Sequence, residues 1–187
     1  MDKEIEQKLT DYTIAHSNYD EKRNYIGLSK IVEPVEKIIE HYQKGMFATD
    51  REKLKCYKGY QMEADLVLRL KKIYGNRIQL GKEKEIVAYN GNVKGHPDVW
   101  LDEISVDAKS FLKDEWLPKP KENLPSRIFW QMQGYMLYSN TDCSYVIFES
   151  RESGIIVCRK VLPYPKVQKQ IDDKIKQALH ELGLLSL

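Results

Sequence analysis

The spacing of the hydrophobic residues changes near residue 77, from that of a helix to that of β-strands, and this change limits the folds open to the chain. Over residues 50–74 the apolar side chains recur at helical intervals, and the pair Gly75-Asn76 that follows commonly closes a helix. Beyond it, apolar and polar residues alternate in three runs, which cover residues 77–89, 93–101 and 104–110. The sequence therefore predicts a long helix followed by three antiparallel strands.

The remaining elements are expected from the same patterns. Residues 1–45 carry a helical apolar stripe, with Pro34 near a helix start, where its missing N–H costs little. Ser126 can cap a helix that runs to about residue 139, after a loop punctuated by prolines. Two strands and an amphipathic helix complete the chain, over residues 144–149, 155–161 and 166–185. The expected order is helix, three strands, helix, two strands, helix.

The composition predicts a single domain in the cytoplasm. At 187 residues, of which 42% are hydrophobic, the chain is long enough to bury a core without metal or disulfide cross-links. No apolar run approaches the about 18 residues of a membrane span, and the start Met1-Asp2-Lys3-Glu4 lacks the features of a secretory signal. The three cysteines lack Cys-x-x-Cys spacing, which predicts reduced thiols. A net charge of +2 neither supports nor excludes DNA as a partner.

Two carboxylates and a lysine stand at a spacing that can form a metal site. Asp98 ends the segment Gly95-His96-Pro97-Asp98, and Asp107 and Lys109 share one face of the next strand because side chains alternate. Asp98 joins that face if the turn lies at Asp102-Glu103. Two neighbouring carboxylates repel each other unless a cation lies between them, and such hard oxygen ligands select Mg²⁺ or Mn²⁺.

The pattern also has a structural explanation. The spacing Asp/Glu-x-Lys recurs in this chain at Glu6/Lys8, Asp20/Lys22 and Asp172/Lys174. A solvent-facing hairpin with weak ion pairs, each contributing about 0 to 1 kcal/mol, would carry the same residues. The motif alone therefore leaves both interpretations open.

Two helices add polar residues on either side of the strands. Glu63 lies on the apolar stripe of the first helix, where a side chain reaching out to water is the alternative to a role in a site. Gln131 and Tyr135 are four residues apart and face the same way on the later helix, where a half-buried amphipathic edge is the alternative.

Together, Glu63, Gly95-x-x-Asp98, Asp107-x-Lys109 and Gln131-x-x-x-Tyr135 resemble the PD-(D/E)XK nuclease superfamily in order and spacing. The pair Gln131-x-Gln133 followed by Met136 resembles its RecB-like and lambda-exonuclease (YqaJ-like) branch. The resemblance implies an α/β (α+β) fold in which helices flank a central mixed β-sheet with the αβββαβ restriction-endonuclease-like core. The matched motifs run from about Glu63 to Glu149. Together with the element order above, they predict one nuclease domain, 1–187, with a helical N-terminal extension at 1–45, the catalytic core at 50–161 and a C-terminal helix at 165–187.

The resemblance also implies a role for each matched residue. Asp98, Asp107 and the backbone carbonyl of Ala108 would ligate Mg²⁺, for which Mn²⁺ can substitute, and Glu63 would reach the ion directly or through water. Lys109 would orient the attacking water and stabilise the charge that develops at phosphorus. Gln131 would hold this lysine or a DNA phosphate, with Tyr135 in support. No iron–sulfur cluster is expected, because the four-cysteine cluster of the iron–sulfur RecB-like nucleases is absent.

Further residues are candidates for accessory roles near this site. His96 could join the metal or a phosphate, although packing is the commoner use of a histidine, and Gln133 belongs to the second half of the glutamine motif. A loop and helix start with cationic and aromatic side chains could contact DNA phosphates and bases. These residues are Lys113, Trp116, Lys119, Lys121 and Arg127. Nearby acidic residues dilute the charge, so a merely solvated loop is the alternative.

The sequence thus predicts a Mg²⁺-dependent nuclease that hydrolyses DNA phosphodiester bonds. An exonuclease in recombination, repair or phage-type DNA processing is favoured by the glutamine motif. The alternatives are a restriction-type endonuclease and a catalytically inactive nuclease fold that binds DNA or acts as a scaffold. DNA is the expected partner, no membrane is expected, and a homo-oligomer or a recombination partner protein is compatible with the resemblance.

Overall fold

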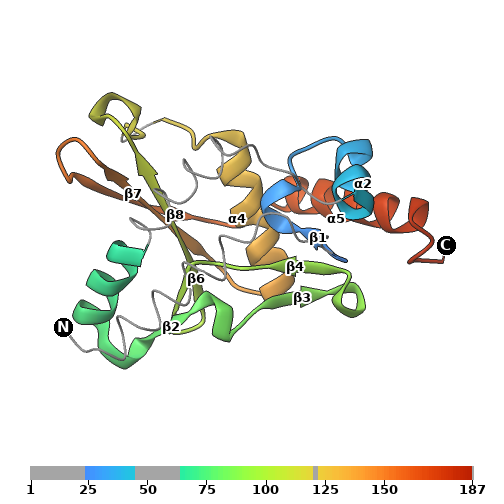
Figure 1. Ribbon diagram of the computed structural model, residues 1–187, viewed down its shortest axis with the longest axis horizontal. Coiled ribbons are helices and arrows are strands. Elements are labelled where there is room, and N and C mark those ends of the chain that lie inside the picture. Colours follow the sequence, from blue (N-terminus) through green and yellow to red (C-terminus); the bar gives the residue numbers. More distant parts are fainter. Residues whose placement is uncertain (1–23, 45–63, 120–121, 187) are drawn as a thin grey trace.

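The computed structural model describes residues 24–44, 64–119 and 122–186 (Figure 1). Its helices are α2 (Val35–Lys44), residues 64–74, α4 (Ser126–Ser139) and α5 (Pro165–Glu181). Its strands are β1 (Ile26–Gly27), β2 (Ile78–Leu80), β3 (Ile86–Ala88), β4 (Val93–Gly95), β5 (Val99–Leu101), β6 (Ile104–Phe111), β7 (Ser144–Ser150) and β8 (Ile156–Val161). Short 3₁₀ turns include η1 (Leu28–Lys30), η3 (Gly81–Glu83) and η5 (Asp114–Trp116).

A five-stranded mixed sheet forms the centre, in the order β2-β5-β6-β7-β8. Strands β6 and β7 are parallel, and the other neighbours are antiparallel. The order of elements and the mixed sheet agree with the predicted fold class. The turn at Asp102-Glu103 is also confirmed, because Leu101 pairs with Ile104 and Asp102 adopts a positive φ of 53°.

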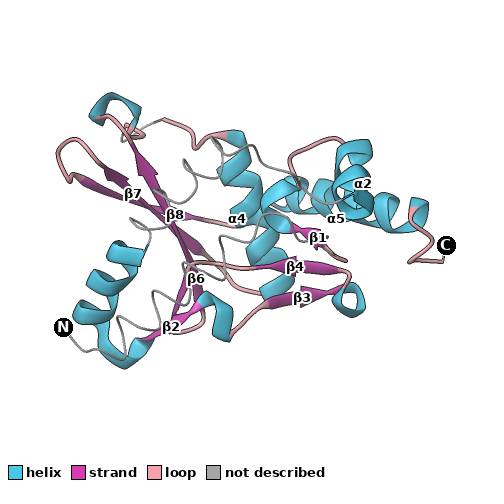
Figure 2. Cartoon of the chain, viewed as in Figure 1, coloured by secondary structure: helices cyan, strands magenta, loops and turns pink. Residues whose placement is uncertain are grey.

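The predicted hairpin of residues 77–89 and 93–101 is interrupted in both strands. The two outer segments of this hairpin, β2 and β5, belong to the central sheet. The two segments next to its turn, β3 and β4, form a second, three-stranded sheet with β1. In Figure 2 this second sheet extends away from the central one, toward α5. The break coincides with Pro97, which has no N–H to donate to a ladder. A continuous pair of long strands was therefore a wrong prediction.

Gly81 makes this break possible. Its N–H donates to the carbonyl of Asp98 at 3.0 Å. A Cβ placed on Gly81 would lie only 1.5 Å from the carbonyl oxygen of Pro97, a backbone atom that cannot move independently. Only glycine allows the two segments to approach this closely.

The N-terminal segment is helical only in part. Helix α2 begins directly after Pro34, as predicted, but Ile26–Gly27 form a strand parallel to β4 and η1 follows it. The cap at the start of α4 also differs, because Pro125 takes the cap position and Ser126 is the first helical residue. The prediction of a helix throughout 1–45 was therefore wrong for residues 26–34.

Two apolar clusters cover the two faces of the central sheet. One contains Val106 and Ala108 of β6 with Leu66 and Val67 of the helix over residues 64–74. The other joins α4 and α5 to β7 and the small sheet. In Figure 1 the helix over 64–74 and α5 lie at opposite ends of the molecule. Alternation along β6 thus leaves Asp107 on the face covered by α4. Among the described helices, none combines the length and apolar character needed to cross a membrane.

Candidate active site

Asp98 and Asp107 meet where β5 begins and β6 continues. At this end of the ladder between β5 and β6 the last paired residues are Val99 and Val106, so Asp98 follows in the position opposite Asp107. The Asp98 Oδ2 atom accepts a hydrogen bond from the backbone N–H of Ala108 at 2.6 Å. The two acidic segments are therefore joined directly, on the strand pair that the sequence predicts.

Asp107 is a buried carboxylate with a cation beside it. Only 1% of its surface is exposed, and its Oδ2 atom forms an ion pair with the ammonium of Lys109, without the angles of a hydrogen bond. The same ammonium donates to the carbonyl oxygen of Ala108 at 3.2 Å. Burial of a charge is costly unless it is paired. Lys109 thus neutralises Asp107 and brings two oxygen atoms around one positive centre.

Helix α4 supplies the polar residues that contact this pair. The Gln131 Nε2 atom donates to Asp107 Oδ1 at 3.4 Å and to the Tyr135 hydroxyl at 2.6 Å. The Tyr135 hydroxyl in turn donates to the carbonyl oxygen of His96 at 2.9 Å. Both side chains are buried. One face of α4 therefore holds the strand that bears Asp107 and the segment that bears Asp98.

Gly95 allows Tyr135 to reach the backbone of this segment. A Cβ placed on Gly95 would lie 2.9 Å from the Tyr135 Cε1 atom, closer than normal contacts permit. The glycine of the motif Gly95-x-x-Asp98 thus has a packing role, two residues along the chain from Pro97. A larger residue at this position would displace the tyrosine ring.

The donor set fits a hard divalent cation. The Asp107 carboxylate and the Ala108 carbonyl converge on the Lys109 ammonium, and the Asp98 carboxylate accepts a hydrogen bond from the N–H of Ala108. Carboxylate and carbonyl oxygens are the ligands that Mg²⁺ and Mn²⁺ prefer. Within residues 24–44, 64–119 and 122–186, no group of three or more histidine, cysteine, aspartate or glutamate side chains is arranged to hold a metal. The proposed fourth member, Glu63, lies outside the described residues.

The two accessory candidates have other contacts. The His96 imidazole lies 2.6 Å from Glu85 Oε1, and its hydrogen bond, with that from Lys94, holds the pKa of Glu85 below its usual range. Gln133 donates to the carbonyl of Leu162 at 2.8 Å and accepts from the N–H of Tyr164 at 2.7 Å. The structure thus gives Gln133 a bridging contact to the chain after β8.

The loop proposed to contact DNA is attached to the β7–β8 hairpin. Asp114 accepts hydrogen bonds from the hydroxyls of Ser150 and Ser153, and Arg159 donates to the carbonyl of Pro118 at 3.0 Å. Between these attachments, the Trp116 side chain is 49% exposed. The loop therefore presents an aromatic ring at a defined position.

The charged residues around Trp116 are partly paired. The Lys113 ammonium lies 6.0 Å from the centre of the Trp116 ring and 3.5 Å from Glu115. Lys119 pairs with Glu122 at 3.9 Å, and Arg127 is exposed at the start of α4. Lys121 lies outside the described residues.

Sequence patterns did not single out two residues that contact the segment leading to Asp98. Gly81 stands inside a predicted strand, where an isolated glycine often marks a close backbone approach, so that signal was present. Glu85, whose carboxylate lies 2.6 Å from the His96 imidazole, had no such signal. Residues of opposite charge that are far apart in the sequence can be recognised as partners only in the folded structure.

The fold is similar to that of several exonucleases of known structure. For the alkaline exonuclease LHK-Exo from Laribacter hongkongensis the TM-score is 0.63 at 13% sequence identity, and the match covers 88% of this chain and 91% of that one. For LHK-Exo in complex with dAMP the TM-score is 0.60 at 13% sequence identity, and the match covers 86% of this chain and 88% of that one. For a phage-related exonuclease from Haemophilus somnus 129PT the TM-score is 0.58 at 13% sequence identity, and the match covers 82% of this chain and 91% of that one. No family model matches the chain, and no curated protein matches it in sequence. The chain thus has a nuclease-like fold.

Proposed function

We propose that the protein is a metal-dependent nuclease that hydrolyses DNA phosphodiester bonds, acting as an exonuclease in recombination, repair or phage-type DNA processing. The observation that carries this proposal is the convergence of Asp107 and the Ala108 carbonyl on Lys109, with Asp98 hydrogen-bonded to the N–H of Ala108. A fold shared with alkaline and phage-related exonucleases supports it. The arrangement corresponds to the Asp98, Asp107-x-Lys109 pattern expected for the PD-(D/E)XK superfamily.

Each residue then has a task that follows from its position. Asp98, Asp107 and the Ala108 carbonyl would hold Mg²⁺, with Glu63 as a further candidate ligand. When bound, the ion would activate water and stabilise the leaving oxygen of the phosphodiester. Lys109, whose side chain is 27% exposed, can turn toward a phosphate and stabilise the charge that develops there. Gln131 would hold the Asp107 carboxylate in place, and Tyr135 would hold the segment that leads to Asp98.

DNA would extend from this site to the loop that follows β6. Trp116 offers a ring face on which a base can stack, and Lys113 next to it can contact a phosphate. Lys119, Lys121 and Arg127 are further candidates for phosphate contacts. LHK-Exo has been crystallised with dAMP, and we propose that this protein also binds nucleotides of DNA.

Cleavage of end-labelled linear duplex DNA tests the activity. We expect degradation with Mg²⁺ or Mn²⁺, none with EDTA, and loss of activity in Lys109→Ala. Lys169→Ala is the matched control, because it removes an exposed lysine on α5 that pairs only with its helix neighbour Asp173 in the described contacts. Undiminished cleavage by Lys109→Ala would overturn the assignment of the site.

Covalently closed circular DNA separates the two kinds of nuclease. An exonuclease requires an end, so the circle should persist under conditions in which the linear form disappears. Cutting of the circle would identify an endonuclease instead. An inactive wild-type protein that still binds DNA would identify a binding or scaffold protein.

A further inference from the structure

The segment before α2 reaches into the region behind the site. Leu28, in η1, is 1% exposed and lies between β4 and α4. A Cβ placed on Gly95 would lie 2.7 Å from Leu28 Cδ1, and one placed on Gly134 would lie 3.3 Å from Leu28 Cδ2. The leucine therefore fills a space that exists because both neighbouring elements carry glycine at the point of contact.

Leu28 and Tyr135 both pack against Gly95. The Cβ position on Gly95 lies 2.7 Å from the leucine and 2.9 Å from the tyrosine ring. The Tyr135 hydroxyl holds the His96 carbonyl, two residues before Asp98, and accepts a hydrogen bond from Gln131. Leu28 therefore packs beside the tyrosine whose hydroxyl bonds Gln131 and the His96 carbonyl.

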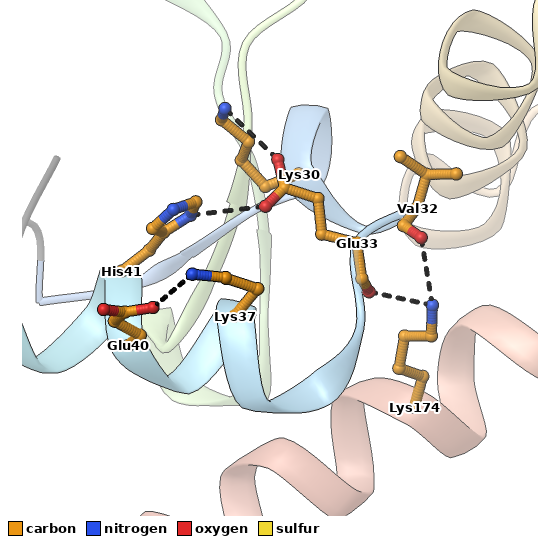
Figure 3. Close-up of polar contacts among 7 residues, drawn as sticks. All are labelled: Lys30, Val32, Glu33, Lys37, Glu40, His41 and Lys174. Atoms are coloured by element: carbon orange, nitrogen blue, oxygen red, sulfur yellow. Dashed lines mark hydrogen bonds and ion pairs between the residues drawn. The ribbon is translucent and has the colours of Figure 1, made fainter. Parts of the chain in front are cut away.

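The segment that carries Leu28 is fastened on both sides. Strand β1 pairs in parallel with β4, with Ile26 opposite Val93. On the other side, the Lys174 ammonium of α5 donates to the carbonyls of Ile31, Val32 and Glu33 at 3.1, 3.4 and 3.0 Å. Figure 3 shows the contacts with Val32 and Glu33.

Lys174 also connects this segment to the helix that bears the glutamine motif. Its ammonium lies 4.7 Å from the centre of the Trp130 ring, and Trp130 immediately precedes Gln131. Burial lowers the pKa of Lys174. On the far side of the loop, the Glu33 carboxylate lies 3.3 Å from the Lys30 ammonium and 3.8 Å from His41 (Figure 3). Charged contacts therefore hold both faces of the loop between η1 and α2.

We infer that residues 26–33 act as a positioning element of the nuclease site, with Leu28 as the positioning residue that seats Tyr135 against the His96 carbonyl. This inference rests on the proposed nuclease function. Its physical basis is that a close-packed interior transmits a loss of volume to the neighbouring groups. A displacement of catalytic groups by about 1 Å can lower a rate by about 100-fold.

The test compares Leu28→Ala with Ile38→Ala. Ile38 is a buried residue of α2 in the same apolar cluster, so its truncation removes a comparable volume away from Gly95 and Tyr135. At a temperature at which circular dichroism shows all variants folded, we expect kcat of Leu28→Ala to fall by about 10-fold or more. KM for DNA should change by less than about 2-fold, since the DNA contacts proposed above lie elsewhere.

Two further variants and the metal dependence complete the test. Leu28→Met, which conserves volume, should restore kcat to within about 3-fold of the wild type. The Mn²⁺ concentration for half-maximal rate should rise in Leu28→Ala and stay unchanged in Ile38→Ala. If Leu28→Ala does not fold, Leu28→Val should show a smaller loss of kcat in the same direction.

The outcomes separate the inference from the proposed function. A wild-type kcat in folded Leu28→Ala, or an equal loss in Ile38→Ala, overturns the inference and leaves the nuclease function standing. Absence of metal-dependent cleavage by the wild type overturns both.

Discussion

The Asp98 carboxylate and the backbone N–H of Ala108 are joined by a hydrogen bond of 2.6 Å. Ala108 lies between Asp107 and Lys109, so the orientation of the first acid depends on the strand that bears the second acid and the lysine. The site is therefore assembled through backbone as well as side chains. A substitution that moves either segment should therefore displace the acidic side chain of the other.

Replacing Lys109 by methionine should separate metal binding from cleavage. The Lys109 ammonium contacts Asp107 Oδ2 and the Ala108 carbonyl, the same oxygens that would bind the metal. Without it, we expect Mn²⁺ to bind at least as tightly as in the wild type, whereas cleavage falls by about 100-fold or more. Calorimetric titration with Mn²⁺ measures the binding, and Asp107→Asn, which should lose it, is the reference. Weaker binding by Lys109→Met would contradict this arrangement of ligands.

Tyr135→Phe should lower activity with a modest loss of stability. The change leaves the His96 carbonyl and Gln131 without the hydroxyl that bonds them, at a cost of about 1–3 kcal/mol in unfolding free energy. We expect kcat to fall by about 10-fold. Tyr138→Phe is the matched control, since it removes the hydroxyl of a half-buried tyrosine that bonds Asp172 one turn further along α4. Equal kcat in the two variants would argue against a role for Tyr135 in the site.

Gly81→Ala should impair both stability and cleavage. The new Cβ would meet the Pro97 carbonyl at 1.5 Å, so the segment that leads to Asp98 must move. We expect a loss of about 2 kcal/mol or more in the free energy of unfolding, within the range of severe overpacking. Denaturant unfolding and the linear-DNA assay measure the two effects. Gln79→Ala, at an exposed position of β2, is the control and should change neither stability nor cleavage. If Gly81→Ala has the stability and cleavage rate of the wild type, the close contact with Pro97 is not required.

Asp172→Asn should remove part of the acid sensitivity of folding. Burial raises the pKa of Asp172, but hydrogen bonds from Lys176, Tyr89 and Tyr138 outweigh it and lower the pKa below the ordinary 3.8. A carboxyl with a lowered folded pKa contributes stability above its unfolded pKa, and the contribution is lost as the pH falls through the folded value.

The wild type should therefore be more stable than Asp172→Asn at pH 7, and the difference should shrink below about pH 3.8. Thermal unfolding between pH 7 and 2.5 measures it. Asp173→Asn serves as control, because the Asp173 carboxylate is more than half exposed and pairs with Lys169 on the surface. A difference between wild type and Asp172→Asn that is independent of pH would contradict the prediction.

Much of the fold was predictable because its elements depend on local patterns. The helix over 126–139, strand β6 and the turn at Asp102-Glu103 were predicted within about one residue, since periodicity and turn residues determine them. The strand at Ile26–Gly27 was missed, because two residues show no period and their partner, β4, lies far along the chain. For the same reason, the role proposed for Leu28 had no sequence signal.

The sequence by itself determined that Asp107 and Lys109 share a face and that Asp98 can stand opposite them. These relationships need only the two-residue period of a strand and a tight turn between neighbours. The tertiary structure decided what meets them: Gln131 on Asp107, Tyr135 on the His96 carbonyl and Gly81 against Pro97. Such contacts join residues from separate elements. They depend on how helices and sheets pack into a filled interior, which no local pattern specifies.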